Sequence, residues 1–327
     1  MNMSMREIIN ADSDTMEWAN ISKWYGASTV RNAPRIMVPL DDKEGQFIYP
    51  KSRQNIVAHD LVKQKGDETI GYILAQSAYR YMFEIGLLET KFVTDVSLKI
   101  VNNEIFASNA SEKLEALAVV IDEGYHAYVA LDFVMQMKQR TGLDPVDIPS
   151  MNGNLKAVNG VLDTIPEEFK NDFYLIACTI AEHTLTKDLL SVGREKDATE
   201  SFTQVMTDHV SDESRHAGYF ARMMKMNWTT NMTEESKDYI GSMLPEYLDE
   251  YLAYDKGRAF EQKVLQQCEF SEPEVQQIIA ETEAEFIENS ESYIATTKDI
   301  IVKLLKRSGF FTHGNTVKVF EQAGLLK

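Results

Sequence analysis

Apolar residues recur at helical spacing through most of the chain after about residue 67. The segment 67–104 contains no proline and repeats its apolar residues with a period near 3.6, which predicts one long helix. The same pattern predicts helices over about 110–140, 164–192 and 197–226, and no segment shows a convincing strand pattern. We therefore expect an all-α protein in which four long helices form a bundle.

Turn and capping residues indicate where these helices begin and end. Gly142 and Pro145 end the second helix. The segment 142–163 is rich in Gly, Asn, Asp and Pro, and its length suits a crossover between antiparallel helix pairs. Thr164 and Glu167 have the spacing of a capping box, which predicts that the third helix opens there.

The ends of the chain are predicted to add to this bundle without forming a second domain. NWTTNMT breaks the fourth helix, after which Thr233 can cap a helix to about 255. A second capping box at Ser271 opens a helix to about 306, and a short helix follows near 315–324. We expect one domain over 1–327, made of a wrapping arm (1–66), a four-helix core (67–226) and additional helices (227–327).

The fourth long helix places charged groups on its apolar side. His209, Glu213 and His216 stand at i, i+4 and i+7, within roughly 60° of one another on a helix. Their stripe is otherwise apolar, carrying Phe202, Val205, Met206, Phe220 and Met223. A buried charge without a partner is costly, so a bound cation would explain the arrangement.

The second long helix repeats part of this pattern. Glu123 and His126 have the same i, i+3 spacing as Glu213 and His216, which lets a carboxylate and an imidazole on adjacent turns reach one metal ion. One Glu-x-x-His is weak evidence, because it recurs by chance on solvated faces. A carboxylate-bridged pair of metals needs this motif from two helices and a single glutamate from each of two others.

The helical wheel supplies the two single glutamates. Glu182 shares its face with Leu175, Cys178 and Leu189 on the third helix. On the first helix Glu89 lies among apolar residues, whereas Glu84 shares its face with Ser77, Arg80, Lys91 and Asp95 and is expected to be exposed. Four core-facing carboxylates and two imidazoles with open coordination positions suit two iron ions, with manganese as the lesser alternative.

Three further polar residues adjoin these candidates. Asp122 and Asp212 each precede a candidate glutamate and can accept the outer N–H of a ligand histidine, and Arg215 can hold an aspartate. They can equally be solvated charges. His209 is outside the six-residue scheme. It is either a core histidine hydrogen-bonded to a ligand or a seventh ligand, and its direction favours the second.

With seven candidates the chain resembles the diiron arylamine N-oxygenases of natural-product pathways, the ferritin-like p-aminobenzoate N-oxygenase type. The resemblance covers about 67–226. It implies that iron is bound by Glu89, Glu123, His126, Glu182, His209, Glu213 and His216. It also implies a homodimer that uses O2 to oxidise a primary amine to the hydroxylamine, and in some members on to nitroso or nitro products. The motif includes no substrate-pocket residue and leaves open whether the amine is an aryl amine or an aliphatic amino acid.

Composition narrows the class of partner. The formal net charge of −18 disfavours nucleic acid or an anionic membrane, and no apolar run approaches the ~20 residues that span a bilayer. With two cysteines and no apolar leader, we expect a cytoplasmic protein. No Gly-x-Gly-x-x-Gly fingerprint is present, so an external electron donor, a reductase or ferredoxin, is implied.

Two other functions use the same metal-binding residues. A radical-generating subunit similar to the small subunit of ribonucleotide reductase would use a tyrosine near the ligands, such as Tyr81, Tyr125 or Tyr128. That function leaves His209 unexplained. An iron-binding or storage protein of the ferritin type is the non-enzymatic alternative, although the chain carries about 100 residues beyond the four helices.

Overall fold

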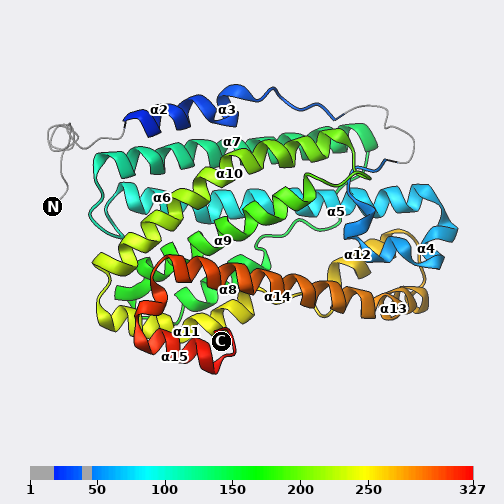
Figure 1. The fold of residues 1–327 in the computed structure, drawn as a ribbon. Coiled ribbons are helices and arrows are strands. Elements are labelled where there is room, and N and C mark those ends of the chain that lie inside the picture. Colours follow the sequence, from blue (N-terminus) through cyan, green and yellow to red (C-terminus); the bar gives the residue numbers. More distant parts are fainter. Residues whose placement is uncertain (1–17, 39–45, 327) are drawn as a thin grey trace.

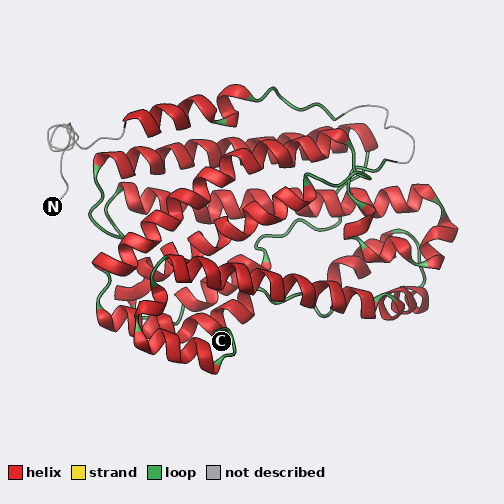
Figure 2. Cartoon of the chain, viewed as in Figure 1, coloured by secondary structure: helices red, strands yellow, loops and turns green. Residues whose placement is uncertain are grey.

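The structure is a computed structural model that describes residues 18–38 and 46–326. Within these ranges the protein is helical (Figure 2). The nearest approach to a sheet among the described residues is an isolated bridge between Phe47 and Ala198. The expected all-α class is confirmed. None of the described helices is long and apolar enough to cross a membrane.

Four rods form the core of the molecule. The first is α5 (Asp67–Leu88) continued by α6 (Thr94–Val101), and the others are α7 (Ala110–Thr141), α9 (Lys170–Val192) and α10 (Glu200–Met226). The α5–α6 rod packs along α7, and α9 packs along α10 (Figure 1). The bundle therefore consists of two helix pairs, and each predicted long helix is present.

A π-helical turn, η3 (Glu89–Val93), joins α5 to α6. A π turn inserts an extra residue into an α-helix and is frequent at functional sites. Its first residue is Glu89, which is fully buried. Glu84, one turn earlier, is partly exposed and accepts a hydrogen bond from Arg80 Nε at 2.9 Å. The choice between the two glutamates made from the helical wheel therefore agrees with the structure.

The connection between the two helix pairs differs from the expectation. It contains a helix, α8 (Gly153–Leu162), whose cap is the side chain of Asn152, accepting from Leu155 N at 2.8 Å. The capping box expected at Thr164 is wrong, because the Thr164 hydroxyl instead donates to main-chain carbonyls of the preceding turn. A short 3-10 turn, η4 (Glu167–Phe169), follows, and α9 begins at Lys170.

The C-terminal third lies against one side of the bundle. After α10 the chain makes a π turn, η5 (Asn227–Asn231), where the sequence predicted a plain break. The following helices are α11 (Glu234–Tyr251), α12 (Ala259–Gln267), α13 (Glu272–Glu281), α14 (Glu283–Arg307) and α15 (Gly314–Gln322), with a 3-10 turn η6 (Phe310–Thr312) before the last. The caps at Thr233 and Ser271 form as predicted. The helix expected from 271 to 306 is interrupted at Thr282, and α12 was not expected.

The N-terminal arm is more helical than the sequence indicated. Its described part contains α2 (Trp18–Ala27), α3 (Thr29–Asn32), the 3-10 turns η1 (Lys51–Arg53) and η2 (Asn55–Ala58), and α4 (Asp60–Lys65). The helices α2 and α3 lie along α7, and α3 also contacts α10 (Figure 1). The arm therefore covers the seam between these two core helices.

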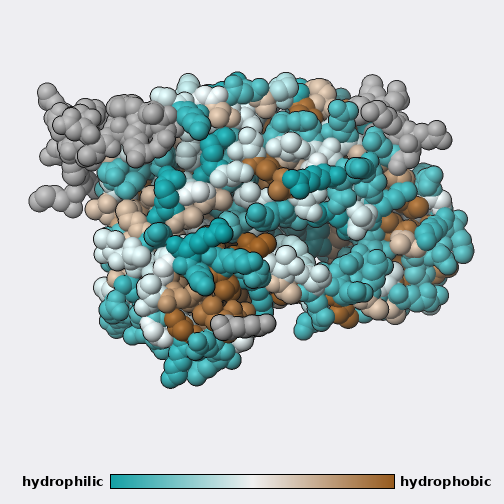
Figure 3. Space-filling model, viewed as in Figure 1, coloured by the Kyte–Doolittle hydropathy of each residue, from teal (hydrophilic) through white to brown (hydrophobic). Residues whose placement is uncertain are grey.

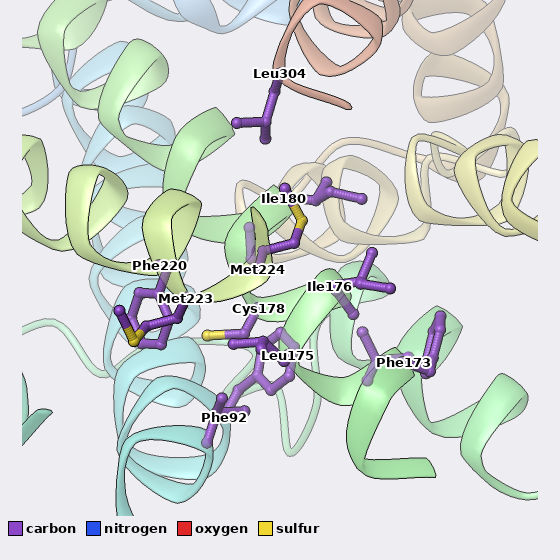
Figure 4. Packing of buried hydrophobic residues seen from close by; sticks show 14 of the residues in the cluster. Phe92, Phe173, Leu175, Ile176, Cys178, Ile180, Phe220, Met223, Met224 and Leu304 are labelled. Carbon is purple, nitrogen blue, oxygen red and sulfur yellow. The ribbon is translucent and has the colours of Figure 1, made fainter. Parts of the chain in front are cut away.

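Apolar side chains fill the bundle on both sides of the polar cluster described below. One group joins α9, α10 and η3 through residues such as Phe92, Cys178 and Phe220 (Figure 4). A second group joins α5, α7 and the start of α10 around Tyr79, Phe133 and Phe202. The outer surface in the view of Figure 3 is mostly hydrophilic, with apolar residues gathered in smaller patches. The two apolar groups therefore enclose the polar side chains inside the bundle.

Candidate metal centre

The seven residues singled out from the sequence converge inside the bundle. Glu89, Glu123, Glu182 and Glu213 come from four different rods and are fully buried. His126 on α7 and His209 and His216 on α10 are 4%, 5% and 0% exposed. Each lies on the face that its helical stripe predicted, so the packing of the rods brings all seven together.

The side chains form two groups that share one member. One group is Glu89, His126, His209 and Glu213, and the other is Glu123, Glu182, Glu213 and His216. Within each group one ligand atom per residue lies within 4.8 Å of the others. Two groups of four with a common carboxylate have the composition of a carboxylate-bridged dinuclear metal site.

Short distances identify the atoms that face each other. His209 Nε2 lies 2.7 Å from Glu89 Oε1 and 3.1 Å from Glu213 Oε1. His216 Nδ1 lies 2.8 Å from Glu123 Oε1, and His126 Nδ1 lies 3.5 Å from Glu123 Oε2. The two oxygens of Glu123 therefore face histidines of different groups.

These close atoms are not paired by hydrogen bonds. Both carboxylate oxygens of Glu89, Glu123, Glu182 and Glu213 are buried without a hydrogen-bond partner, and so is the inward nitrogen of each of the three histidines. Buried polar groups are normally satisfied, since an unpaired one costs about 1–3 kcal/mol, more for a charged group. These unpaired oxygens and nitrogens converge on two places inside the bundle, as the ligand atoms of bound cations do. Carboxylate oxygens and imidazole nitrogens are ligands that suit iron or manganese.

The electrostatics of the side chains alone lead to the same conclusion. Burial, followed by the neighbouring carboxylates of Glu213 and Glu123, raises the pKa of Glu182 well above its usual range. Burial raises the pKa of Glu89 to about 7 despite the nearby histidines. Such shifts mean that Glu89 and Glu182 resist being charged without a cation, whereas, despite burial, the three histidines hold the pKa of Glu213 well below its usual range.

The outer nitrogens of two histidines are held by aspartates in a crossed arrangement. His126 on α7 places Nε2 at 3.0 Å from Asp212 Oδ2 on α10. His216 on α10 places Nε2 at 3.3 Å from Asp122 Oδ2 on α7. Both aspartates are fully buried. These contacts fix Nδ1 of each ring toward the cluster, and Arg215 donates to Asp212 as the sequence suggested.

The arm supplies further contacts that the sequence did not reveal. Trp24 Nε1 donates to Asp122 Oδ2 at 2.9 Å, and the Ser28 hydroxyl donates to the other oxygen. Thr29 donates to Asp212 from its main-chain nitrogen at 3.2 Å and from its hydroxyl. The sequence marks this role only weakly. Trp24 is followed by two small hydroxyl residues, in a segment without a clear helical stripe.

Comparison with known families identifies the chain. Residues 33–301 match the family described as p-aminobenzoate N-oxygenase AurF. The chain belongs to this family. AurF-type proteins are diiron oxygenases of ferritin-like fold, so the protein is an enzyme, and its buried Glu/His cluster fits the dinuclear metal site that the AurF family implies. A search of curated proteins finds no match.

AurF membership favours the N-oxygenase over the two other classes considered from the sequence. It implies an amine substrate and O2 as reactants. The matched segment contains all seven clustered residues and both aspartates, whereas Trp24, Ser28 and Thr29 precede it. The arm contacts on the aspartates are therefore a feature of this chain beyond the matched family region.

Proposed function

We propose that the protein binds two iron ions and uses O2 to N-oxygenate a primary arylamine in a natural-product pathway. One iron would be held by Glu89, His126, His209 and Glu213, and the other by Glu123, Glu182, Glu213 and His216. Glu213 belongs to both groups, which supports a bridging role, and Glu123 faces histidines of both. Iron is preferred to manganese because the family is a diiron family.

The observation that carries this proposal is the set of buried carboxylate oxygens and histidine nitrogens left without hydrogen-bond partners at shared points. His209 belongs to one group only. One ion would then receive two imidazoles and its neighbour one. An additional nitrogen ligand changes the electronic character of the ion it reaches, and the protein tunes a metal by such choices.

Bound iron would supply the reduction of O2 that delivers an oxygen atom to the amine nitrogen. In the first stage an N–H becomes N–OH, and the second oxygen atom leaves as water after uptake of two electrons and two protons. We propose that a separate reductase or ferredoxin supplies these electrons. The side chains of the protein position the ions, and Asp122 and Asp212 fix the ring orientation of His216 and His126.

The apolar walls exclude bulk water from the site. Phe92, Phe220 and Cys178 belong to the buried group around it, and Ala116 and Val119 belong to it on α7. A dry interior strengthens the electrostatic interactions of the carboxylates and limits side reactions of activated oxygen. We further propose that the whole chain works as one domain and that the enzyme is a homodimer.

The test is metal loading followed by a single turnover. Anaerobic titration with ferrous ion is expected to saturate at two ions per chain. Addition of reductant, an arylamine and 18O-labelled O2 is expected to give a hydroxylamine that carries the label. Glu89→Gln should lose an ion and the activity, while Glu68→Gln, an exposed glutamate on the same rod, should retain both. Loading at one ion, or product without label, would contradict the proposal.

A further inference from the structure

A cavity of about 600 Å3 lies between α5, α9 and α14, beside the helical turns that carry Glu89 and Glu182. Its walls include Leu88 and Ala181, the residues directly before Glu89 and Glu182 in the chain. Ile85 and Leu185, about one turn from the same glutamates, also line it. The cavity therefore rests on the helical turns that carry one glutamate from each side of the cluster, and its volume is typical of a small-molecule site.

A larger cleft of about 1780 Å3 lies next to this cavity, between the 147–154 segment, α8 and α11. Several residues line both hollows, namely Glu84, Asn152, Asn154, Tyr251, Ala253 and Tyr254. The two hollows therefore lie side by side along this shared wall, and we infer that a ligand approaches the turns of Glu89 and Glu182 from the side of α8 and α11.

A third hollow adjoins the histidines. It is lined by His126 and His209 together with residues of the arm, but its volume is about 110 Å3. An engineered apolar cavity that binds benzene has a volume of about 150 Å3, so this hollow is small for a substituted aromatic ring. The amine is therefore assigned to the cavity between α5, α9 and α14.

Among the described residues that line the inner cavity, none offers an uncommitted cation to a bound acid. Arg53 lines it, but its guanidinium lies 3.1 Å from Asp188 and 3.3 Å from Glu195. Glu84 at the junction with the outer cleft is paired with Arg80. Glu261 also lines the cavity, and the cation that interacts with it, Arg80, is already paired with Glu84. The charged residues around the cavity thus carry a surplus of negative charge.

The charged residues that line the outer cleft also carry a surplus of negative charge. Its described lining contains two basic residues, Arg80 and Lys156, and seven acidic ones, which are Glu84, Asp147, Glu235, Asp238, Glu246, Glu250 and Asp255. Clefts lined by one sign of charge concentrate ligands of the opposite sign and repel ligands of the same sign. A carboxylate approaching by this route would be repelled at the entrance and left without a counter-ion inside.

A neutral polar group has a partner in the cavity. Asn55 lines it, and the Asn55 Nδ2 donor is buried without a hydrogen-bond acceptor. An uncharged oxygen on the ligand can accept from this donor. The Tyr81 hydroxyl, in contrast, is already committed, because it donates to Asp188 at 2.7 Å.

From this charge pattern, and resting on the proposed N-oxygenation, we propose that the substrate is an arylamine that carries no carboxylate, with an uncharged or cationic group at the end remote from the reacting nitrogen. The enzyme would then differ in substrate charge from the p-aminobenzoate enzyme after which its family is described. Like charges brought together at a binding site oppose binding strongly, so the discrimination against an acid is expected to reach about tenfold or more.

Three probes of similar shape test this proposal: 4-aminobenzoate, 4-aminobenzamide and 4-aminobenzylamine, whose remote groups are anionic, neutral and cationic. Calorimetric binding to the protein without added metal is expected to rank them in rising affinity in that order. In turnover by the iron-loaded enzyme, kcat/KM should rank them likewise. Affinity for 4-aminobenzylamine should fall as salt is raised, because charges at an open cleft are screened.

Charge variants link the ranking to the cavity. Glu261→Lys should raise the affinity for 4-aminobenzoate and lower that for 4-aminobenzylamine, each by several-fold. Glu288→Lys makes the same change in net charge at an exposed position of α14 outside the cavity lining and should leave the ranking as it is. Leu185→Trp, which fills the inner cavity, should abolish binding of every probe, with circular dichroism to verify folding.

The outcomes separate this proposal from the proposed function. Binding of 4-aminobenzoate as tight as that of the other two, or no binding of any probe, would overturn the charge assignment. A shift of equal size in Glu261→Lys and Glu288→Lys would place the selectivity outside the cavity and overturn it as well. The expected binding order without oxygenation of any amine by the iron-loaded enzyme would instead contradict N-oxygenation and leave the charge preference standing.

Discussion

The contact between Asp212 and His126 gives a direct test of how the second layer supports the metal centre. Asp212 is fully buried and lies 3.0 Å from His126 Nε2, while Thr29 and Arg215 donate to its oxygens. Asp212→Asn keeps the shape of the side chain but removes the charge and replaces one acceptor oxygen by a donor amide. The amide cannot accept from all of these donors.

The size of the effect follows from the role of such partners. Replacing an outer-layer partner of a ligand histidine typically weakens metal binding by about 10–100-fold, which corresponds to about 1.4–2.7 kcal/mol. Here the change also frees the imidazole of His126 to rotate. We therefore expect Asp212→Asn to fall within this range at the site that contains His126, with less effect at the site of His216.

The assay is competition between the protein and a coloured chelator for a divalent ion under anaerobic conditions. Far-UV circular dichroism should report an intact helical fold. The matched control is Asp208→Asn, one turn earlier on α10, where the carboxylate is partly exposed and accepts from Gln204. Equal metal affinities for the wild type and Asp212→Asn would show that the aspartate does not tune the histidine and would refute this reasoning.

Three other perturbations have defined outcomes. His209→Ala should keep the fold but weaken one of two sites by about tenfold or more, so that ion titration becomes biphasic; an unchanged titration would make His209 a structural residue. Gly241→Ala should destabilise the protein by about 1–3 kcal/mol, because its Cβ would collide with Thr316 of α15, whereas Gly86→Ala in open space should stabilise it slightly; equal melting temperatures would argue against the α11–α15 packing. Saturating ferrous ion at about 100 times its Kd should stabilise the fold by about 2.7 kcal/mol for each site that fills, or about 5.4 kcal/mol for two, seen as a higher melting temperature under anaerobic conditions, and chelator should reverse it.

The long helices could be predicted because their apolar stripes are strong and uninterrupted. The same stripes explain why Glu89 could be chosen over Glu84, since only Glu89 shares its face with apolar residues that the structure buries. Glu123, Glu182 and Glu213 followed from the same reasoning, because a carboxylate among core residues needs a specific compensation.

The shorter elements could not be predicted because tertiary contacts hold them in place. Isolated helices of the length of α8 or α12 are marginal in water, so their stability comes from packing that the local pattern does not encode. The capping box expected at Thr164 failed because the Thr164 hydroxyl donates to carbonyls at the end of α8, and Pro166 takes the cap position of the following turn η4. The π turn at Glu89 likewise has no separate signature in the apolar repeat.

The roles of the two crossed aspartates could be predicted only in part. The sequence placed Asp122 and Asp212 next to ligand glutamates and suggested the role, but which histidine each one holds depends on the relative displacement of α7 and α10. That displacement is a property of the packed pair. The contacts of Trp24 and Thr29 with the aspartates could not be predicted from the sequence, because they join residues separated by 98 and 183 positions in the chain.

These separations bear on the order in which the enzyme matures. During synthesis Trp24, Ser28 and Thr29 leave the ribosome early, but Asp212 follows Thr29 only after 183 further positions. Contacts between such distant residues form late in folding, since long loops must close first. The earliest described helix of the chain would thus be among the last segments to dock, and iron would be acquired after translation has passed His216.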